Sequence, residues 1–599
     1  MSKKLSGTAY KTFRLMADRS FLFCSQFTVF LEIKFKVGDC IMKLSGAKIL
    51  LKSLKEMGVD VLFGYPGGQV LPIYDALYDE EGLKHILTAH EQGATHAADG
   101  YARATGKVGV VLVTSGPGAT NTVTGIATAF RDSVPLVVIT GQVPKALIGK
   151  AAFQEVDILG ITTPITKERF IVNDVRELPS IVEKAFDIAM KGRKGPVVID
   201  IPKDIQVSQI EVDSSIYGER KNQGKNSFVD DICMKNINQA VELINNCERP
   251  LIYAGGGIIS GDASEELLEF SEKIKSPVTC SLMALGGFPG EHENFTGMIG
   301  MHGTRCSNFA ATKSDLLIAI GARFSDRVTS KTDGFAPGAK IIHIDIDQME
   351  IGKNVRVDIP LKGDVKEILT LLNKRVQEKN SNDWNSRIQE CKKNYPLKYE
   401  KGDALCGQFV IEKLFEITKG DCIITTEVGQ NQIWAAQYFK YSTPRSLITS
   451  GGLGTMGFGL GAAIGASFGG TGKKVINVAG DGSFKMNSTE LVTLAKYKVP
   501  MVQLVLNNSC LGMVRQWQEM FYNGHYSHTL FDEDIDFAKL GEVYKIKGIT
   551  ITKEEEVEDA LKYALGLNEP VIIDCKISRG EKVFPMVAPG ANIDDMIFE

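Results

Sequence analysis

From Met42 onward, short apolar runs alternate with longer segments of helical periodicity. The runs that predict strands in the first third of the chain are residues 59–63, 83–89, 108–114, 136–140 and 197–201. Between them, residues 47–57 and segments that begin at Glu91 and Ala119 predict helices. The strand runs are almost continuously apolar, which is typical of parallel strands covered by helices on both faces. The pattern therefore predicts an α/β fold.

The same pattern occurs twice more. Further strand runs are residues 250–254, 277–281, 316–320 and 341–346, followed by 422–425, 475–478, 501–506 and 571–574. Polar, charged stretches at 208–231 and 374–403 separate the three sets and predict linkers. We therefore expect three doubly wound, mostly parallel α/β domains, approximately at residues 42–207, 230–375 and 400–599.

Residues 1–41 differ from the rest, with seven Lys or Arg, three Asp or Glu and several Phe. An organellar presequence is one interpretation, although the acidic residues and the lack of a cleavage signal weaken it. We favour an N-terminal appendage that is not part of the fold, with the folded protein beginning near Met42. A cytoplasmic protein of bacterial type is expected, and organellar targeting by residues 1–41 stays open.

Composition narrows the function classes. The chain has 599 residues with 68 basic and 72 acidic side chains, so it lacks the basic excess of a nucleic-acid-binding protein. Its 11 cysteines are odd in number and never form C-x-x-C, which indicates a reducing compartment rather than a disulfide scaffold or zinc site. No uncharged apolar run reaches the ~18 residues of a membrane helix, so no membrane partner is expected.

Two strand ends in the last third carry candidate metal chemistry. The run 475–479 leads into Gly480-Asp481-Gly482, and after 24 intervening residues the next strand leads into Asn507-Asn508. Ligands bind at the carboxyl ends of parallel strands. One carboxylate from Asp481 and one amide oxygen from Asn508 suit Mg²⁺ completed by phosphate oxygens, a backbone carbonyl and water. The alternative is a common turn and a polar loop.

The run GDGSF…LNN resembles the diphosphate-binding motif of thiamine-diphosphate enzymes. In that family a glutamate from the pyrimidine-binding domain of a different subunit reaches the other end of the cofactor. Glu91, in the segment HEQG after the apolar run 86–89, matches that glutamate. Taken alone, Glu91 could equally be an exposed acid in the first turn of a helix.

Longer segments narrow the resemblance to the catalytic large subunits of acetohydroxyacid (acetolactate) synthase. They include YPGGQVLPIYDAL, HEQGATHAADGYARATG, TSGPGATN, AFQEVDI, GPVVIDIPKDIQ, HIDID, GQNQIWAAQ and SGGLGTMGFGLGAAIGA, and they extend from about Met42 to the C-terminus. The segments MHGT, RFSDR and GMVRQW are more selective for this family than the others.

This resemblance implies a transferase of branched-chain amino-acid biosynthesis. Such an enzyme decarboxylates pyruvate through a thiamine-diphosphate ylide and transfers the hydroxyethyl unit to a second pyruvate or to 2-oxobutyrate, giving acetolactate or acetohydroxybutyrate. Glu91 would promote the imino tautomer of the cofactor. The alternatives are an FAD-independent catabolic acetolactate synthase, a pyruvate oxidase or decarboxylase, and a non-catalytic binding module of the same fold. A nicotinamide dehydrogenase fails because no strand–G-x-G-x-x-G–helix unit is present.

The resemblance also implies site residues. Gly68, Val428, Gly429, Gln430, Gly454, Gly482 and Ser483 match residues that line thiamine diphosphate, and Met456 matches the residue that props its V shape. Asp481, Asn508 and the backbone carbonyl of Cys510 match the Mg²⁺ ligands. Gln154 and Lys203 match residues near the substrate entrance, and Met513, Val514 and Trp517 match the acceptor pocket. Gln69 stands where many relatives have Ala.

The middle domain is expected to bind FAD in a largely structural role. The matching residues are Arg193, Gly255, Gly256, Met301, His302, Gly303, Arg323, Arg327, Asp345 and Asp364. Arg can bind phosphate and Asp can bind ribose hydroxyls. Ser325 departs from the family, which has Asp there.

Trp517 carries a separate specificity hypothesis. Met513 and Trp517 are spaced i, i+4 in a helical run beyond Asn508, so they share one helix face. That face would contact the extra methyl of 2-oxobutyrate, or would simply pack in the core. An active site shared between subunits implies a homodimer at least, with a tetramer and a small regulatory subunit left open. The relative use of the two acceptors and feedback inhibition also stay open.

Overall fold

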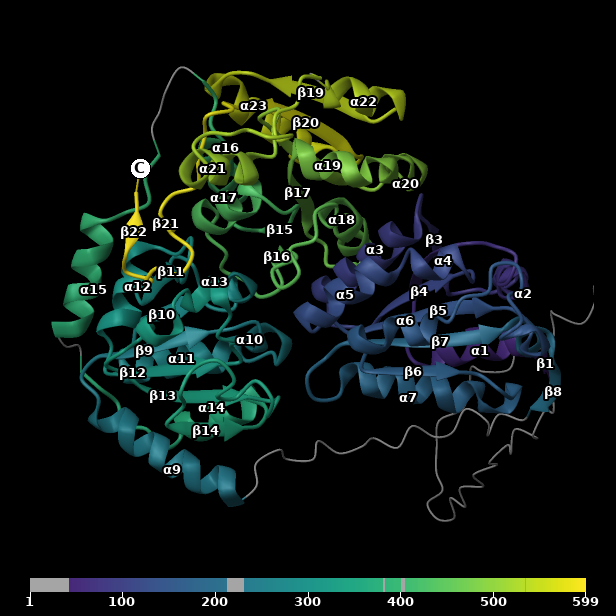
Figure 1. Cartoon of the computed structure of the whole chain (residues 1–599), viewed down its shortest axis with the longest axis horizontal. Helices are drawn as coiled ribbons and strands as arrows, with labels where there is room; N and C mark the ends of the chain where they lie inside the picture. The colour runs from purple at the N-terminus through teal and green to yellow at the C-terminus, as the bar shows by residue number, and fades with distance from the viewer. Residues whose placement is uncertain (1–41, 213–230, 381–382, 400–403, 534, 599) are drawn as a thin grey trace, which may run out of the picture.

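The computed structural model describes residues 42–212, 231–380, 383–399, 404–533 and 535–598. These residues form three α/β units, each built on a six-stranded parallel sheet with helices on both faces (Figure 1). The predicted fold class is therefore confirmed. The N-terminal appendage at 1–41 and most of the first predicted linker lie outside the described residues.

The first unit has the strand order β3-β2-β4-β5-β7-β6. Its strands are β2 (Val61–Tyr65), β3 (Lys84–Leu87), β4 (Gly109–Val113), β5 (Leu136–Gln142), β6 (Glu168–Ile171) and β7 (Pro196–Pro202). Its helices are α1 (Gly46–Glu56), α2 (Leu71–Tyr78), α3 (Glu91–Thr105), α4 (Pro117–Thr120), α5 (Val123–Asp132), α6 (Ile158–Thr162), α7 (Leu178–Met190) and α8 (Lys203–Val207). A separate antiparallel pair joins β1 (Met42–Ser45) to β8 (Gln209–Val212).

The middle unit has the order β11-β10-β9-β12-β13-β14. Its strands are β9 (Pro250–Ala254), β10 (Val278–Cys280), β11 (Phe295–Met298), β12 (Leu316–Ile320), β13 (Lys340–Asp345) and β14 (Ile359–Lys362). Its helices are α9 (Asp231–Asn246), α10 (Gly257–Ser260), α11 (Ser264–Ile274), α12 (Arg305–Lys313), α13 (Asp326–Thr329) and α14 (Val365–Asn373), and α15 (Asp383–Asn394) follows.

The third unit has the order β16-β15-β17-β18-β20-β19. Its strands are β15 (Cys422–Thr426), β16 (Leu447–Ile448), β17 (Lys474–Gly480), β18 (Met501–Asn507), β19 (Lys547–Ile551) and β20 (Val571–Lys576). Its helices are α16 (Gly407–Thr418), α17 (Gln430–Tyr438), α18 (Gly459–Phe468), α19 (Asp481–Asn487), α20 (Leu491–Tyr497), α21 (Gly512–Phe521), α22 (Phe537–Val543) and α23 (Glu554–Gly566). The hairpin β21 (Met586–Val587) and β22 (Met596–Ile597) lies beside α12 of the middle unit (Figure 1).

Helices α3 and α18 join the first unit to the third (Figure 1). A Cβ at Gly100 would lie 2.0 Å from the carbonyl oxygen of Ala462, and one at Gly465 would lie 1.7 Å from that of Ala97. Only glycine permits such close backbone approach. The small residues of these two helices therefore set how tightly the first and third units pack.

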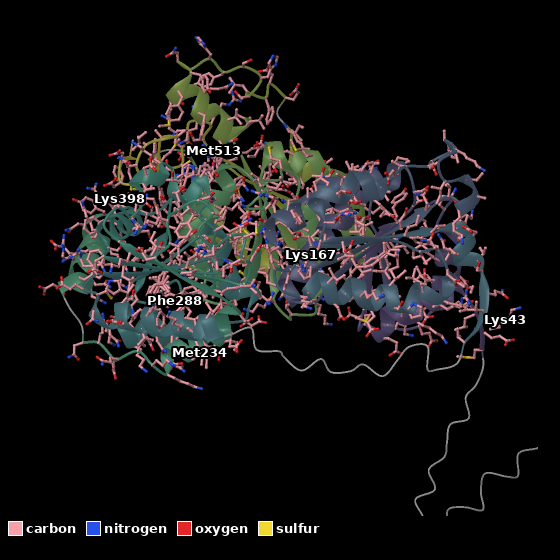
Figure 2. All side chains as sticks on the ribbon, turned by 60° about the horizontal axis from the view of Figure 1, so that its bottom comes forward. Lys43, Lys167, Met234, Phe288, Lys398 and Met513 are labelled. Carbon is pink, nitrogen blue, oxygen red and sulfur yellow. The ribbon has the colours of Figure 1, made fainter. Side chains whose placement is uncertain are left out.

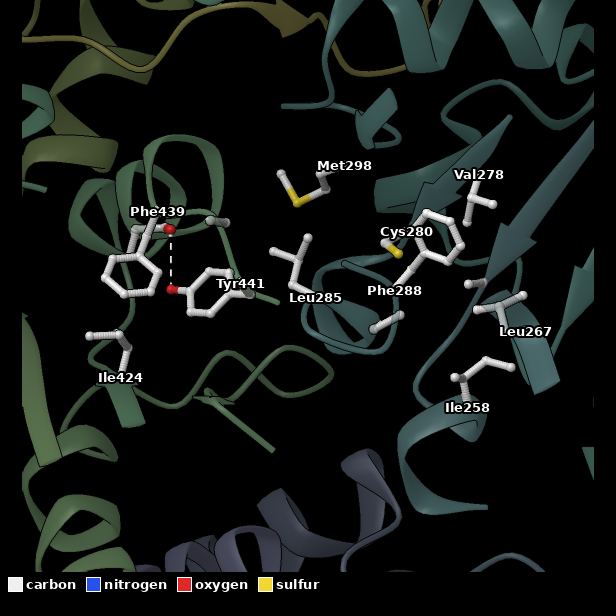
Figure 3. Packing of buried hydrophobic residues seen from close by; sticks show 14 of the residues in the cluster. Ile258, Leu267, Val278, Cys280, Leu285, Phe288, Met298, Ile424, Phe439 and Tyr441 are labelled. Atoms are coloured by element: carbon white, nitrogen blue, oxygen red, sulfur yellow. Dashed lines mark hydrogen bonds between the residues drawn. The ribbon is translucent and has the colours of Figure 1, made fainter. Parts of the chain in front are cut away.

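The middle and third units share one continuous apolar core. Figure 3 shows Leu285 and Met298 of the middle unit facing Phe439 and Tyr441 of the third, where the Tyr441 hydroxyl donates to the carbonyl of Ala435 at 3.1 Å. Figure 2 shows side chains filling the space between the ribbons. Such shared burial holds the two sheets in a fixed relation.

Two stretches predicted as linkers contain regular structure. Residues 209–212 form β8, and residues 383–394 form α15, whose Trp384 and Ile388 are buried against the middle unit. The linker prediction was wrong there because a charged helix with two buried apolar positions has little apolar periodicity. The predicted helix beginning at Ala119 is two helices, α4 and α5. Among the described residues, no helix is long and apolar enough to cross a membrane.

Candidate active site

The carboxyl ends of β17 and β18 bring Asp481 and Asn508 together. The two strands are parallel neighbours, with Gly480 in register with Leu506. Asp481 is 1% exposed, and its Oδ1 atom has no hydrogen-bond partner among the described residues. Burial raises the pKa of Asp481 to about 6. An unpaired buried carboxylate oxygen is unfavourable unless a cation or a proton compensates its charge. The place where β17 and β18 end, with Asp481 and Asn508 side by side, is called the corner below, and it suits a bound cation.

Other oxygen atoms would have to complete such a cation's shell. No group of three or more His, Cys, Asp or Glu side chains in the described part of the chain could hold a metal ion. Asn508 Oδ1 accepts from the amide of Cys510 at 3.3 Å, which turns the Cys510 backbone at the same corner. This donor set fits Mg²⁺ whose remaining ligands come from a phosphate-bearing group.

Gln430 connects this corner to α21. Its Oε1 accepts from Asn508 Nδ2 at 3.2 Å, and its Nε2 donates to Gln516 Oε1 at 3.1 Å. A Cβ at Gly512 would lie 2.0 Å from Gln430 Oε1, and one at Gly482 would lie 2.7 Å from a methyl group of Leu511. Glycine at both positions therefore allows the start of α21 to pack directly on the corner.

Two buried acids, Glu427 and Asp132, hold the loop at residues 450–458, which carries Gly454 and Met456. Glu427 accepts from the amides of Gly457 at 2.8 Å and Leu460 at 3.1 Å, and from the hydroxyl of Ser483 at 2.7 Å. Burial raises the pKa of Glu427. Glu427 therefore connects the loop to Ser483, which lies two residues after Asp481.

The other end of the loop is held by Asp132 of the first unit. Asp132 accepts from the amides of Gly452 at 2.7 Å and Gly451 at 3.2 Å, and it pairs with Arg103 at 3.0 Å. The Arg103 guanidinium also pairs with Asp99 at 2.5 Å. Both acids are buried, so the loop is fixed by charge-assisted hydrogen bonds away from water.

Glu91 is the first residue of α3, immediately after its N-cap, His90. Asn121 Nδ2 donates to Glu91 Oε2 at 2.9 Å, and a Cβ at Gly118 would lie 3.2 Å from Oε1. Glu490 of the third unit accepts from the amides of Ala89 and His90 at 3.0–3.1 Å. These contacts orient the helix end that presents Glu91.

Among the remaining predicted residues of the first unit, Lys203 and Gly68 are in contact. Lys203 Nζ donates to the carbonyl of Gly68 at 2.9 Å. Gln154 has φ of +60° and lies against Gly116, where a Cβ would be 2.8 Å from the Gln154 carbonyl oxygen. The Oε1 atom of Gln69 is buried, with no partner in the part of the chain that the structure describes.

A cavity of about 1660 Å³ lies among the three units. Fourteen of the predicted site residues line it: Arg193, Gly256, Met301, His302, Arg323, Arg327, Asp345, Asp364, Val428, Gly429, Gly454, Met513, Val514 and Trp517. The other predicted residues do not line it: Gly68, Glu91, Gln154, Lys203, Gly255, Gly303, Gln430, Met456, Asp481, Gly482, Ser483, Asn508 and Cys510. The single chain therefore brings the FAD and acceptor-pocket candidates together, and holds Glu91 elsewhere, in the first unit.

The polar lining of the cavity includes arginine and aspartate side chains. Arg193 pairs with Glu350 at 2.9 Å and Asp347 at 3.3 Å. Burial, together with the charge of Arg193, lowers the pKa of Arg323. Burial raises the pKa of Asp345 to about 6. A pocket of this size, well above the ~300–1,000 Å³ of drug-sized ligands, suits an extended ligand with both acceptor and donor groups.

Three of the predicted FAD contacts differ in their burial and in their hydrogen-bond or ion-pair partners. His302 Nδ1 is buried without a partner among the described residues, and burial lowers the pKa of His302 to about 4, so a neutral ring lines the cavity. Asp364 is the N-cap of α14 and accepts from the amides of Lys366 and Glu367. Arg327 is largely exposed and pairs with Asp326.

Helix α21 presents Met513, Val514 and Trp517 to the cavity. Val514 is 48% exposed, whereas Gln516 on the opposite side is fully buried and donates to the carbonyl of Val583 at 3.0 Å. Trp517 stacks edge-on against Phe521 at 5.6 Å. The shared face of Met513 and Trp517 therefore borders the cavity, and Met513 also packs against the apolar core.

The sequence reasoning missed three buried acids that shape this site: Asp132, Glu427 and Glu490. Glu427 had a signal, because it follows the apolar strand β15 directly, as Asp481 follows β17. Asp132 and Glu490 act on backbone amides more than 300 residues away in sequence, and no local pattern indicates such a contact.

Three family models match consecutive parts of the chain. They are the thiamine pyrophosphate enzyme N-terminal TPP binding domain at residues 44–161, the central domain at 237–372 and the C-terminal TPP binding domain at 427–575. Thiamine pyrophosphate and thiamine diphosphate are the same cofactor. The fold is that of a thiamine pyrophosphate enzyme.

Individual relatives narrow the class. A probable acetolactate synthase large subunit of Methanocaldococcus jannaschii is 47% identical, covering 92% of this chain and 95% of its own. An acetolactate synthase large subunit of Buchnera aphidicola is 47% identical, covering 92% and 98%. The acetolactate synthase isozyme 2 large subunit of Escherichia coli is 43% identical, covering 92% and 99%. The chain belongs to the family of acetolactate synthase large subunits.

Proposed function

We propose that this chain is the catalytic subunit of an acetolactate synthase. It would decarboxylate pyruvate and join the remaining two-carbon unit to a second pyruvate or to 2-oxobutyrate. The observation that carries the proposal is the buried corner at Asp481 and Asn508, with its unpaired carboxylate oxygen, in a chain of this family. When bound there, thiamine diphosphate would supply the carbanion chemistry of carbon–carbon bond cleavage and formation.

The chain's own residues would bind and orient the cofactor. Asp481 Oδ1, Asn508 Oδ1 and the Cys510 carbonyl would hold Mg²⁺, which in turn would hold the diphosphate. Val428, Gly429, Gln430, Gly454, Gly482 and Ser483 would line it, with Met456 beneath it. Gly482 fits this role because its missing side chain leaves room beside Leu511.

Glu91 would hold a proton against the pyrimidine end of the cofactor. Asn121 already fixes Oε2, so Oε1 is the atom left to face a ligand, beside Gly118. Because the family resemblance assigns this glutamate to a different subunit from the diphosphate site, we propose that Glu91 serves the site of a second copy. The assembly is then a homodimer at least, with Gly68, Gln154 and Lys203 beside the same shared site.

The cavity residues favour FAD as a second, structural cofactor. Arg193, Arg323 and Arg327 would face its diphosphate, Asp345 and Asp364 its hydroxyl groups, and Gly255, Gly256, Met301, His302 and Gly303 its remaining surface. The unpaired Nδ1 of buried His302 supports a polar ligand at this position. This lining favours the FAD-containing biosynthetic enzyme over the FAD-independent catabolic one.

Met513, Val514 and Trp517 would form the acceptor pocket at one end of the cavity. The relatives are named large subunits, and we propose a small regulatory subunit as a further partner. We also propose a cytoplasmic location.

The proposal is tested with purified protein, pyruvate, thiamine diphosphate and Mg²⁺, with and without 2-oxobutyrate. Acetolactate and acetohydroxybutyrate are measured separately by mass spectrometry. Formation of both products supports the proposal, whereas acetaldehyde or acetate as the main product would indicate a decarboxylase or an oxidase. Flavin released on denaturation tests the FAD assignment, and active protein that neither contains nor binds FAD would favour the catabolic enzyme.

A further inference from the structure

Two thiols meet where α12, which follows residues 301–303, packs against α15. Cys306 is the second residue of α12, and Cys391 lies near the end of α15. Their Sγ atoms are 2.8 Å apart, with Cys306 donating to Cys391. Both Cys306 and Cys391 are free thiols.

The packing of the two helices holds this contact in place. Trp384 and Ile388 precede Cys391 by seven and three residues, so all three lie on the face of α15 that packs against α12 (Figure 1). The Trp384 indole donates to the carbonyl of Pro250 at 2.9 Å and stacks on Phe309 of α12 at 6.2 Å. Rotation or sliding of α15 would break these contacts, so the two sulfur atoms stay near each other.

The two thiols differ in a way that suits stepwise oxidation. Cys306 is 2% exposed, whereas Cys391 is half-buried and can meet a small oxidant. The hydrogen bond from Cys306 and the adjacent Arg305 guanidinium lower the pKa of Cys391, while that same contact raises the pKa of Cys306. A thiolate is the form that attacks an oxidant, so Cys391 is the thiol that reacts first.

We propose that Cys306 and Cys391 are a redox site that closes to an intramolecular disulfide under peroxide. The Cys391 thiolate attacks one oxygen of hydrogen peroxide, the O–O bond breaks, and hydroxide leaves, which gives a sulfenic acid. The Cys306 sulfur then attacks Cys391 Sγ, the S–O bond breaks and water leaves after proton transfer. Two thiols are oxidised by two electrons, and one peroxide is reduced to two waters.

The bond needs little movement. The Sγ atoms must approach by about 0.8 Å to reach the ~2.05 Å length of a disulfide. Both residues are in helices, so rotation about the cysteine χ1 angles is the first movement available.

The disulfide would link α15, which lies between the middle and third units in sequence, to α12 of the middle unit. Arg305, beside Cys306, lies over the Tyr395 ring at 3.8 Å and over Phe598 near the C-terminus at 5.2 Å. α15 precedes the third unit, and the bridge would close an 85-residue separation and hold α15 against α12. A loop of that size gives a large entropic restraint on the unfolded chain.

Mass spectrometry of the full chain tests the proposal. Native protein is treated with hydrogen peroxide, blocked with iodoacetamide and digested with trypsin without reduction. The expected product is peptide 306–313 linked to peptide 388–392, lost on treatment with dithiothreitol. Cys391→Ser should abolish it. Cys247→Ser is the matched control, because Cys247 is also a half-buried cysteine of the middle unit, and it should leave the product unchanged.

Thermal unfolding supplies a second measurement. Peroxide should raise the apparent midpoint of the wild type and of Cys247→Ser by ~5 °C relative to treated Cys391→Ser, and dithiothreitol should reverse the rise. The proposal is overturned if Cys306 and Cys391 are both recovered as alkylated thiols after peroxide treatment. A linked peptide that forms only in urea-unfolded protein would overturn it equally.

Discussion

At the residue scale, the proposed site contains polar side chains with atoms that lack a hydrogen-bond partner among the described residues. Asp481 is buried with an unpaired oxygen, Glu91 has one oxygen fixed and one free, and His302 faces the cavity as a neutral ring. Each arrangement is unfavourable or incomplete in the isolated chain. Such groups are where ligand binding or proton transfer is expected.

Glu91→Gln should lower turnover by about 10²–10⁴-fold while thiamine diphosphate still binds, because the proposed diphosphate anchor lies in the third unit. Steady-state assays and cofactor binding by fluorescence quenching measure the two effects. Glu81→Gln, an exposed acid of the same unit, is the control and should behave as wild type. Near-normal turnover of the Glu91 variant with saturating cofactor would remove Glu91 from the proposed mechanism.

Trp517→Leu should reduce any preference for 2-oxobutyrate over pyruvate by about 10–200-fold, the range that one methyl group supplies in an apolar pocket. The ratio of acetohydroxybutyrate to acetolactate in a mixed-substrate assay measures it. Phe521→Leu is the control, because Phe521 contacts Trp517 but does not line the cavity. If both variants keep the wild-type ratio, Trp517 has a packing role only.

Asp200→Asn tests a buried acid outside the proposed chemistry. Burial raises the pKa of Asp200 to about 7 despite hydrogen bonds from Thr140 and Gln142. Between the ordinary pKa of 3.8 and about 7 the folded chain keeps a proton that the unfolded chain has released, so this group's contribution to stability falls as pH rises through that window. Because asparagine has no titrating carboxyl, the stability of Asp200→Asn should not fall in this way as the pH rises.

The midpoint of Asp200→Asn minus that of wild type should therefore be more positive at pH 7.5 than at pH 5. Thermal unfolding at both pH values measures the difference, and Asp79→Asn, an exposed acid, should show none. An equal difference at the two pH values would show that Asp200 does not titrate in this window.

At the element scale, the loop at residues 450–458 is held by residues of two different units. Its first half is fixed by Asp132 of the first unit and its second half by Glu427 at the end of β15. Phe458 at the end of the loop is fully buried, and the two acids hold backbone amides on either side of Gly454 and Met456. The element therefore depends on the contact between units as well as on local sequence.

Asp132→Asn should loosen this loop, because it removes one partner of a buried ion pair, a change that typically costs about 3–5 kcal/mol before compensation by other groups. Hydrogen exchange of peptides that contain Gly451 and Gly452 should become faster, and the concentration of thiamine diphosphate needed for activity should rise. Asp174→Asn breaks the exposed pair with Arg176 and is the control, since exposed pairs contribute little. Unchanged exchange in the Asp132 variant would contradict the anchoring role.

At the scale of the whole molecule, the third unit shares an apolar core with each of the other two units. At the contact between the first and third units, glycine and alanine residues also bring α3 and α18 close together. The large cavity lies where the three units meet. The arrangement explains why residues from all three units line a single cavity.

Deletion of residues 1–41 should leave solubility and activity essentially unchanged, because the strand β1 begins at Met42 and the first unit is then complete. Deletion of residues 1–45 is the comparison. It removes the pairing of β1 with β8 and the Ser45 N-cap of α1, and caps of this kind contribute about 0.5–2 kcal/mol. Thermal unfolding and activity should therefore fall only in the longer deletion. Equal losses in both would show that residues 1–41 contribute to the fold.

The sequence by itself determined the class of fold and the corner at Asp481 and Asn508. Continuous apolar runs at 250–254 and 316–320 coincide with strands β9 and β12, because parallel strands that are buried on both faces consist almost entirely of apolar residues. The short or edge strands β11, β14, β16 and β19 were not predicted, since few apolar residues suffice there. Strand-end motifs were readable because the acid and the amide directly follow their strands.

Only the tertiary structure decided which distant segments meet. The anchoring of one loop by Asp132 and Glu427, the cap on α3 by Glu490, the packing of α15 and the contact between Cys306 and Cys391 all join residues that no local pattern connects. The physical reason is that a local pattern records whether a segment is buried, through the free energy of removing apolar surface from water. A hydrogen bond or a thiol contact depends instead on the geometry of its partner, and that geometry exists only once the units have packed.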